Sequence, residues 1–190
     1  MLPQSPSQTV GPFFHDGLIF RGENVLVREG ARGERIVLTG RILDGQRQPV
    51  TDAMIEIWQA DAAGIYGHPS DPRSQDADPA FHGFGRSDTW HPGDAFRFET
   101  IKPGAVPQAA GGTLAPHVCV TIFARGLLTH LTTRIYFADE PAANAADPVL
   151  TAVPSARRPT LLAVREPGPA AVYRIDLVLQ GADETVFFEP

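Results

Sequence analysis

The sequence predicts an all-β protein, a two-layer β-sandwich with long loops and an N-terminal arm. Gly and Pro contribute 18 residues each to a chain of 190, so turns interrupt the chain at short intervals. Between the turns lie seven or more short runs that are rich in β-branched and aromatic residues. Runs of this kind and number favour two packed sheets around one core.

The first sixteen residues combine Ser, Thr, Pro and Gly with the pair Phe13-Phe14. A segment of this composition does not fold alone, but its aromatic pair can pack against another surface. We therefore expect residues 1–16 to be an arm, and residues 17–190 to form a single sandwich domain.

The strands are expected in the following order. A β-branched run from Arg35 forms the first strand and enters a turn at Asp44-Gly45, where Gly45 supplies the positive φ that such turns favour. The next strand places Ile55, Ile57 and Gln59 on one face and Met54, Glu56 and Trp58 on the other, because side chains alternate across a sheet. Later strands are expected at residues 96–100, 118–123, 132–137, 161–165 and 173–180.

Two segments between these strands differ in character. Residues 61–95 show no sustained period and are predicted to be a long, ordered loop region, a feature that is often functional. The Ala-rich residues 141–149 favour a helical turn.

Composition excludes several classes of protein. The net charge is −6, with 22 acidic and 16 basic residues and no run of Lys or Arg, so nucleic acid is not an expected partner. No stretch of 18 apolar residues occurs, and the N-terminus lacks a signal-peptide pattern, so we expect no membrane span and a cytoplasmic location. Cys119 is the single cysteine, which excludes an internal disulfide.

Four segments in order carry a resemblance to a known family. They are EIWQADAAGIY at residues 56–66, TIKPG at 100–104, APH at 115–117 and TRIYF at 133–137. Together they resemble the intradiol ring-cleaving dioxygenases. Residues 6–13 and 181–188 are similar to the two ends of the alpha subunits in the members that cleave protocatechuate, so the resemblance covers nearly the whole chain.

The resemblance implies a β-sandwich and a family metal site of non-haem Fe(III) held by two tyrosines and two histidines in the beta subunits. By motif position, Tyr66 and His117 correspond to one tyrosine and one histidine, whereas Val106 and Cys119 stand where the other two ligands are expected. Valine has no lone pair, and one tyrosine, one histidine and one thiol would form a softer and incomplete ligand set from which ferric intradiol chemistry is not expected. The arginine that precedes the histidine motif in beta subunits is also absent here. We therefore expect no metal in this chain and Fe(III) only in a partner beta subunit.

The resemblance also implies what the chain contributes instead. Residues of the arm and one arginine are expected to complete the substrate pocket over the partner's iron: Thr9, Gly11, Pro12, Phe13 and Arg125. The Arg125 guanidinium suits the ring carboxylate of protocatechuate. Phe13 stands where a tyrosine is often found. The implied reaction is intradiol cleavage of protocatechuate with O₂ to 3-carboxy-cis,cis-muconate by a hetero-oligomer, with the isolated chain inactive.

Alternative interpretations remain open on the residues alone. The chain could be a self-contained metal enzyme that uses Tyr66, His117 and Cys119, or a non-catalytic ligand-binding sandwich. Tyr66 and His117 are also common as satisfied interior polar residues, and Cys119 as a small buried hydrophobe with nothing basic next to it in sequence. Three aromatic residues are expected to be core or interface anchors, the last two against a partner: Trp58, Phe187 and Phe188.

Overall fold

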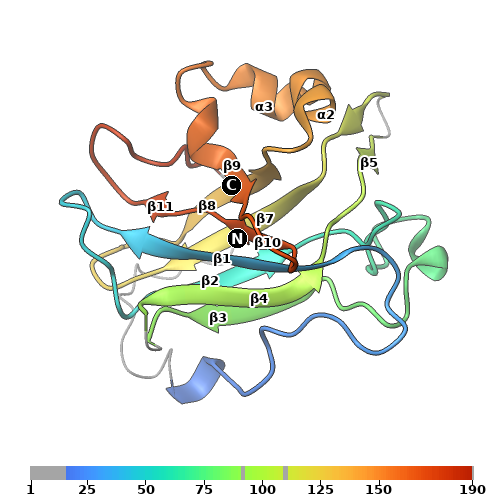
Figure 1. Cartoon of the computed structure of the whole chain (residues 1–190), viewed down its shortest axis with the longest axis horizontal. Coiled ribbons are helices and arrows are strands. Elements are labelled where there is room, and N and C mark those ends of the chain that lie inside the picture. Colours follow the sequence, from blue (N-terminus) through green and yellow to red (C-terminus); the bar gives the residue numbers. More distant parts are fainter. Residues whose placement is uncertain (1–15, 91–92, 109–110, 190) are drawn as a thin grey trace, which may run out of the picture.

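The computed structural model describes residues 16–90, 93–108 and 111–189. Its strands form two layers, seen obliquely in Figure 1. The first layer contains β1 (Arg35–Leu43), β4 (Ala95–Ile101), β10 (Val172–Arg174) and β11 (Leu177–Val178). The second contains β2 (Met54–Trp58), β3 (Phe84–Asp88), β7 (His117–Phe123), β8 (Leu131–Phe137) and β9 (Leu162–Arg165).

Hydrogen-bonded pairing fixes the order of strands in each layer. In the first layer β1 lies between β4 and β10, with β11 beside its C-terminal end. In the second layer the order is β3, β2, β7, β8 and β9. The strand β9 pairs with β8 and also with β10, so it joins the two layers along one edge. The predicted all-β sandwich is confirmed.

The main core lies between the layers and is built by alternation along each strand. From β7, Val118, Val120 and Ile122 point inward and are buried. They meet residues of the first layer such as Leu38 and Phe98. Because neighbouring residues in a strand face opposite sides, the residues between them point to the outer face of the second layer.

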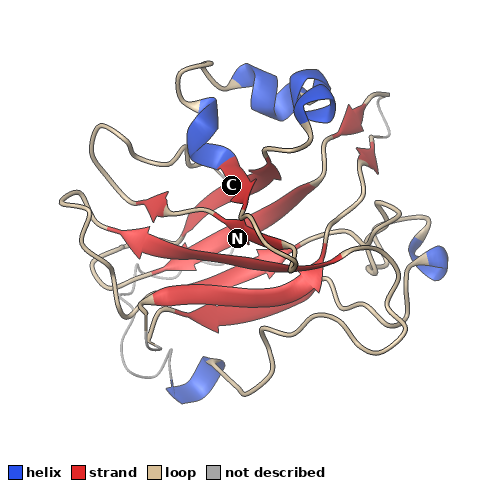
Figure 2. Cartoon of the chain, viewed as in Figure 1, coloured by secondary structure: helices blue, strands red, loops and turns tan. Residues whose placement is uncertain are grey.

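Helices occupy only the margins of the molecule, as Figure 2 shows. The α-helices α2 (Pro141–Ala146) and α3 (Pro148–Ala152) agree with the predicted helical segment, and residues 16–18 are helical as well. Short 3₁₀ helices are η1 (Ser74–Asp76) and η2 (Arg158–Leu161), and a small two-stranded ribbon is formed by β5 (Val106–Pro107) and β6 (Thr113–Leu114). Among the described residues, no helix has the length and apolar character needed to cross a membrane.

The prediction that residues 61–95 form a loop region is wrong for β3. This strand, with sequence FGRSD, contains no β-branched residue, and it forms because its backbone pairs with β2 from Met54↔Asp88 to Trp58↔Phe84. Tertiary pairing here overrides weak local propensity. The rest of the region is irregular apart from η1 and the residues at its end that enter β4.

Two smaller expectations also need correction. The strand expected at residues 173–180 is divided into β10 and β11. At the turn after β1 the positive φ is found at Arg47 (60°) and not at Gly45.

The C-terminal aromatics pack in part within this chain. Phe187 lies against the main core, and the N–H of Phe188 donates to the Thr132 carbonyl at 2.8 Å. Both side chains are partly buried, so their further burial against a partner stays a prediction.

Candidate functional site

The outer face of the second layer carries a row of side chains across three adjacent strands. Trp58 of β2 pairs with Cys119 of β7, and Cys119 pairs with Arg134 of β8. One step along, His117 pairs with Tyr136, and their rings lie 5.9 Å apart. Directly opposite residues in antiparallel strands have Cβ atoms about 5 Å apart. These five side chains therefore form one cluster at one end of the layer, called here the pocket end.

Tyr66 reaches this cluster from the loop that follows β2. Its ring stacks on Trp58 with centroids 5.8 Å apart and an interplanar angle of 13°. The loop is held by the buried carboxylate of Asp61, which accepts hydrogen bonds from the N–H groups of Ala63 (2.9 Å), Ile65 (3.0 Å) and Asp78 (2.9 Å).

A second loop packs tightly against the first and brings Val106 beside Tyr66. A Cβ on Gly64, whose φ is +72°, would lie 2.0 Å from the Ala105 oxygen, and a Cβ on Gly104 would lie 2.4 Å from the Ala62 oxygen. Only glycine permits this approach of the two backbones. As a result Tyr66 packs against a small cluster made by Ala60, Val106 and Leu114.

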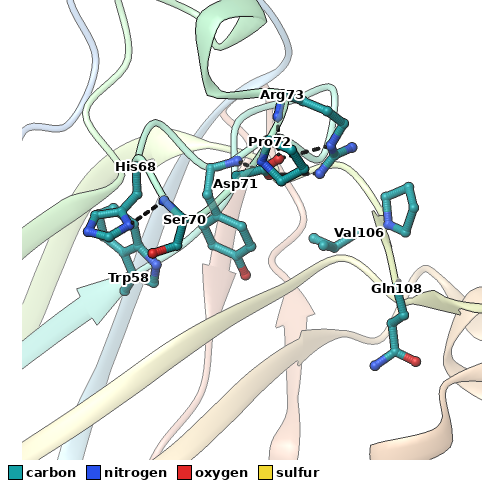
Figure 3. A pocket seen from close by; sticks show the side chains of 10 residues that line it. Trp58, His68, Ser70, Asp71, Pro72, Arg73, Val106 and Gln108 are labelled. Atoms are coloured by element: carbon teal, nitrogen blue, oxygen red, sulfur yellow. Dashed lines mark hydrogen bonds and ion pairs between the residues drawn. The ribbon is translucent and has the colours of Figure 1, made fainter. Parts of the chain in front are cut away.

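A cavity of about 600 Å³ opens beside these residues. Figure 3 shows Trp58 and His68 on one side of it and Val106 and Gln108 on the other. The remaining lining residues are Tyr66, Ser70, Asp71, Pro72, Arg73 and Pro107.

Asp71 and Arg73 close one wall of the cavity. The Arg73 guanidinium donates to both carboxylate oxygens of Asp71, at 3.1 and 2.8 Å, and to the Gly64 carbonyl at 2.9 Å. The hydrogen bond from the Arg73 side chain is the main reason that the pKa of Asp71 falls to about 2. Since Asp71 also accepts the N–H of Tyr66 at 3.1 Å, this ion pair helps to hold the tyrosine in place.

Burial controls the protonation of the groups at the pocket end. It raises the pKa of the Tyr66 phenol to about 12, and the nearby Cys119 raises it further, while Arg134 lowers it in part. Burial also raises the pKa of the Cys119 thiol and lowers the pKa of His117. His117 donates from Nδ1 to the Ala115 carbonyl at 2.7 Å, which leaves Nε2 as the lone-pair nitrogen.

Arg134 is the residue of this cluster that sequence reasoning missed. Burial lowers the pKa of its guanidinium, but the hydrogen bond with Tyr136 and the acidic groups around it raise the pKa overall. The Tyr136 hydroxyl in turn donates to Asp147 at 3.3 Å, and Asp147 is fully buried at the start of α3. Arg134 thus places a cation at the pocket end, although residues 112–116, directly before His117, contain none.

The side chains gathered at the pocket end do not fit a ferric ion. Tyr66, Val106, His117 and Cys119 lie near one another, but Val106 offers no donor atom. A ferric site of this family needs tyrosinate oxygens, and Cys119 supplies a soft sulfur instead. Among the described residues, no group of three or more His, Cys, Asp or Glu is arranged to hold a metal ion.

Arg125 lies at the opposite end of the same layer. It follows the C-terminal end of β7, where its Nε contacts the Asp52 carboxylate at 2.9 Å and its side chain is 73% exposed. The strand β7 extends from His117 to Phe123, a length of about 20 Å at 3.3 Å per residue, and Arg125 lies two residues beyond its end in a turn. The structure therefore does not bring Arg125 into the pocket of its own chain. The other predicted pocket residues, Thr9, Gly11, Pro12 and Phe13, lie outside the described residues.

Comparison with known proteins agrees with this fold. A family model described as "Dioxygenase" matches residues 10–181. A protocatechuate 3,4-dioxygenase alpha chain from Burkholderia cepacia is 45% identical over 205 residues, covering 99% of this chain and 98% of the relative. The beta chain from the same organism is 36% identical over 190 residues, covering 96% and 78%. The solved dioxygenase domain of a Streptomyces carbohydrate-binding fusion protein superposes with a TM-score of 0.62 at 26% identity, covering 94% of this chain and 100% of that one.

The family match over residues 10–181 gives this β-sandwich its class, that of a dioxygenase. The chain belongs to the intradiol dioxygenase family. Within this family it is similar, over its full length, to the alpha chains of protocatechuate 3,4-dioxygenase.

Proposed function

We propose that this chain is the iron-free alpha subunit of a protocatechuate 3,4-dioxygenase and completes the substrate pocket over the Fe(III) of a beta subunit. The proposed reaction is intradiol cleavage of protocatechuate with O₂ to 3-carboxy-cis,cis-muconate. The unpaired thiol of Cys119 is consistent with the cytoplasmic location that we also propose.

One observation supports this proposal: Arg125 and the pocket end lie at opposite ends of β7, a strand about 20 Å long. At the pocket end, Val106 and Cys119 stand where ferric ligands would be expected. A guanidinium so placed cannot contact a substrate in its own pocket. If Arg125 binds substrate, the substrate must be held by another chain.

The surface around Arg125 has the character of a contact region. Trp90, just after β3, is 62% exposed, and Leu128, in the turn between β7 and β8, is 71% exposed. The register of β2, β3, β7 and β8 places both at the same end of the layer as Arg125. Exposed Trp and Arg side chains are typical of interface anchors, and Leu128 adds exposed apolar surface beside them.

The partner proposed for this surface is a beta chain of the same enzyme. In the assembly, Fe(III) held by that chain supplies the activation of the catechol ring toward O₂. This chain's part is to bind and orient: the Arg125 guanidinium would pair with the ring carboxylate, and the arm residues Thr9, Gly11, Pro12 and Phe13 would cover the ring and exclude water.

The proposal is tested by expressing this chain alone and together with its candidate beta chain. Iron per chain and O₂ uptake with protocatechuate are then measured for both preparations. We expect iron and ring cleavage only in the co-expressed complex. Iron-dependent cleavage by the single chain would instead identify a self-contained enzyme, and a complex without cleavage would leave only a ligand-binding role.

A further inference from the structure

Arg134 lies beside the residues that stand at the metal-ligand positions of this family, because it is directly opposite Cys119 in the register of β7 and β8. The guanidinium projects from β8 on the outer face, in the same transverse row as Cys119 and Trp58. It is hydrogen-bonded to Tyr136, whose ring packs against His117. Its charge also acts on Tyr66 from the other side of the cluster. Four residues stand at the metal-ligand positions of the family, and three of them lie near Arg134: Tyr66, His117 and Cys119.

The charge of Arg134 is balanced from within the protein. Arg134 bonds to Tyr136, and the Tyr136 hydroxyl donates to Asp147 at 3.3 Å. Asp147 has no exposed surface and is held further by the N–H groups of Ala115 and Leu150, each at 2.8 Å. One nitrogen of Arg134, Nη1, is buried and has no hydrogen-bond partner in the described part of the chain. Part of the guanidinium is therefore buried at the pocket end without a hydrogen bond to compensate it.

We propose that Arg134 is a built-in cation that takes the place of the metal ion in this chain's own pocket and excludes metal from it. A second cation beside this half-buried guanidinium, whose Nη1 atom is buried, meets charge repulsion that solvent screens only in part. Loss of the two ligand side chains at Val106 and Cys119 is then only part of the reason that the pocket holds no iron. Restoring those ligands while Arg134 remains does not restore a site.

This inference rests on the proposed iron-free role of the chain, and the test separates the two. Two variants are compared in the complex with the beta chain. The two-ligand variant carries Val106→Tyr and Cys119→His, and the triple variant carries Arg134→Gln as well. The cavity beside Val106 gives room for the larger side chain. Gln keeps a polar side chain next to Tyr136 but removes the charge. The matched control adds Arg97→Gln, an exposed arginine of β4, in place of the change at Arg134.

The measured quantities are iron per alpha-beta pair and the visible absorption that tyrosinate gives to ferric iron. We expect the iron content to double, relative to the wild-type complex, only when Arg134 is replaced. A doubled content in the two-ligand variant or in the Arg97 control would overturn the inference, as would an assembled Arg134→Gln triple variant without extra iron. Iron in the wild-type chain's own pocket would instead contradict the proposed function.

A second measurement covers the case in which the triple variant does not assemble. The single change Arg134→Gln leaves Tyr66, His117 and Cys119 as a partial set that suits a softer divalent ion such as Co²⁺. We expect Co²⁺ to bind at least tenfold more tightly than in the wild-type or Arg97→Gln complexes, followed by the thiolate-to-cobalt absorption band. Equal affinity in the three complexes would sink the inference.

Discussion

At the scale of single residues, a few buried carboxylates decide the geometry of the pocket end. Asp61 accepts three backbone N–H groups from the loop that carries Tyr66. Asp71 accepts the Tyr66 N–H itself. Asp147 caps α3 and anchors the Tyr136 hydroxyl. Through these hydrogen bonds, the three carboxylates position the Tyr66 and Tyr136 side chains, and Tyr136 in turn bonds to Arg134.

Asp61→Asn is expected to lower the free energy of unfolding by about 1–3 kcal/mol. The amide has one acceptor oxygen where the carboxylate has two, so at least one buried N–H loses its partner. Urea denaturation of the complex or of the chain measures the change. The exposed Asp183→Asn serves as the control, because the ion pair of Asp183 with Arg47 is at the surface. Equal stability of the two variants would contradict this role of Asp61.

The low pKa of Asp71 predicts a component of stability that depends on pH. The pKa of this carboxyl is about 2 in the folded chain, against an ordinary value of 3.8, mainly because of its hydrogen bonds with Arg73. A group with a lowered folded pKa stabilises the fold above its ordinary pKa, and that contribution disappears as pH falls toward the folded pKa. The stability advantage of wild type over Asp71→Asn should therefore be full above about pH 4 and fade toward pH 2. Urea midpoints between pH 2 and 6 measure it, and a constant difference across this range would refute the assignment.

At the scale of elements, the pocket end depends on two loops that only glycine can bring together. A Cβ at Gly104 would meet the Ala62 oxygen at 2.4 Å and the Gly64 nitrogen at 2.6 Å, both backbone atoms. This contact sets the separation of Tyr66 and Val106. It also gives a physical reason for the glycines in the two segments DAAGIY and TIKPG.

Gly104→Ala is therefore expected to destabilise the chain by about 1–3 kcal/mol, as overpacked sites commonly do. Gly17→Ala is the matched control, since a Cβ at Gly17 has no atom within 4 Å among the described residues, and its effect should stay within about 0.5 kcal/mol. Thermal unfolding of the two variants side by side measures the difference. Similar melting temperatures would mean that the loops separate without cost.

At the scale of the whole molecule, the separation of Arg125 from the pocket end makes the function a property of an assembly. In the complex, Arg125→Gln should lower kcat/KM for protocatechuate by about tenfold to hundredfold, the value of one hydrogen bond between charged groups. The effect should lie mostly in KM, and the iron content should not change. Phe13→Ala in the arm should act in the same direction.

Arg97→Gln is again the matched control, because it removes an exposed arginine from β4, in the other layer. Steady-state O₂ uptake measures both variants. Unchanged kinetics in Arg125→Gln and Phe13→Ala together would exclude the proposed pocket role for this chain. Loss of iron in Arg125→Gln would instead indicate that the arginine supports the assembly.

The sequence by itself determined the sandwich class, most strand positions and the grouping of Tyr66, Val106, His117 and Cys119. These depend on local signals: turn residues, alternation along one strand, and motifs that keep their order. Alternation alone places His117 and Cys119 on one face of β7.

Only the tertiary structure decided which distant residues share the pocket end. Arg134 is a strand residue like many others until the register of β7 and β8 sets it opposite Cys119. The strand β3 forms only because β2 offers an edge to pair with, and Arg125 is separated from the pocket by the length of β7. Register and strand length depend on contacts between residues far apart in sequence, and such contacts leave no local pattern to read.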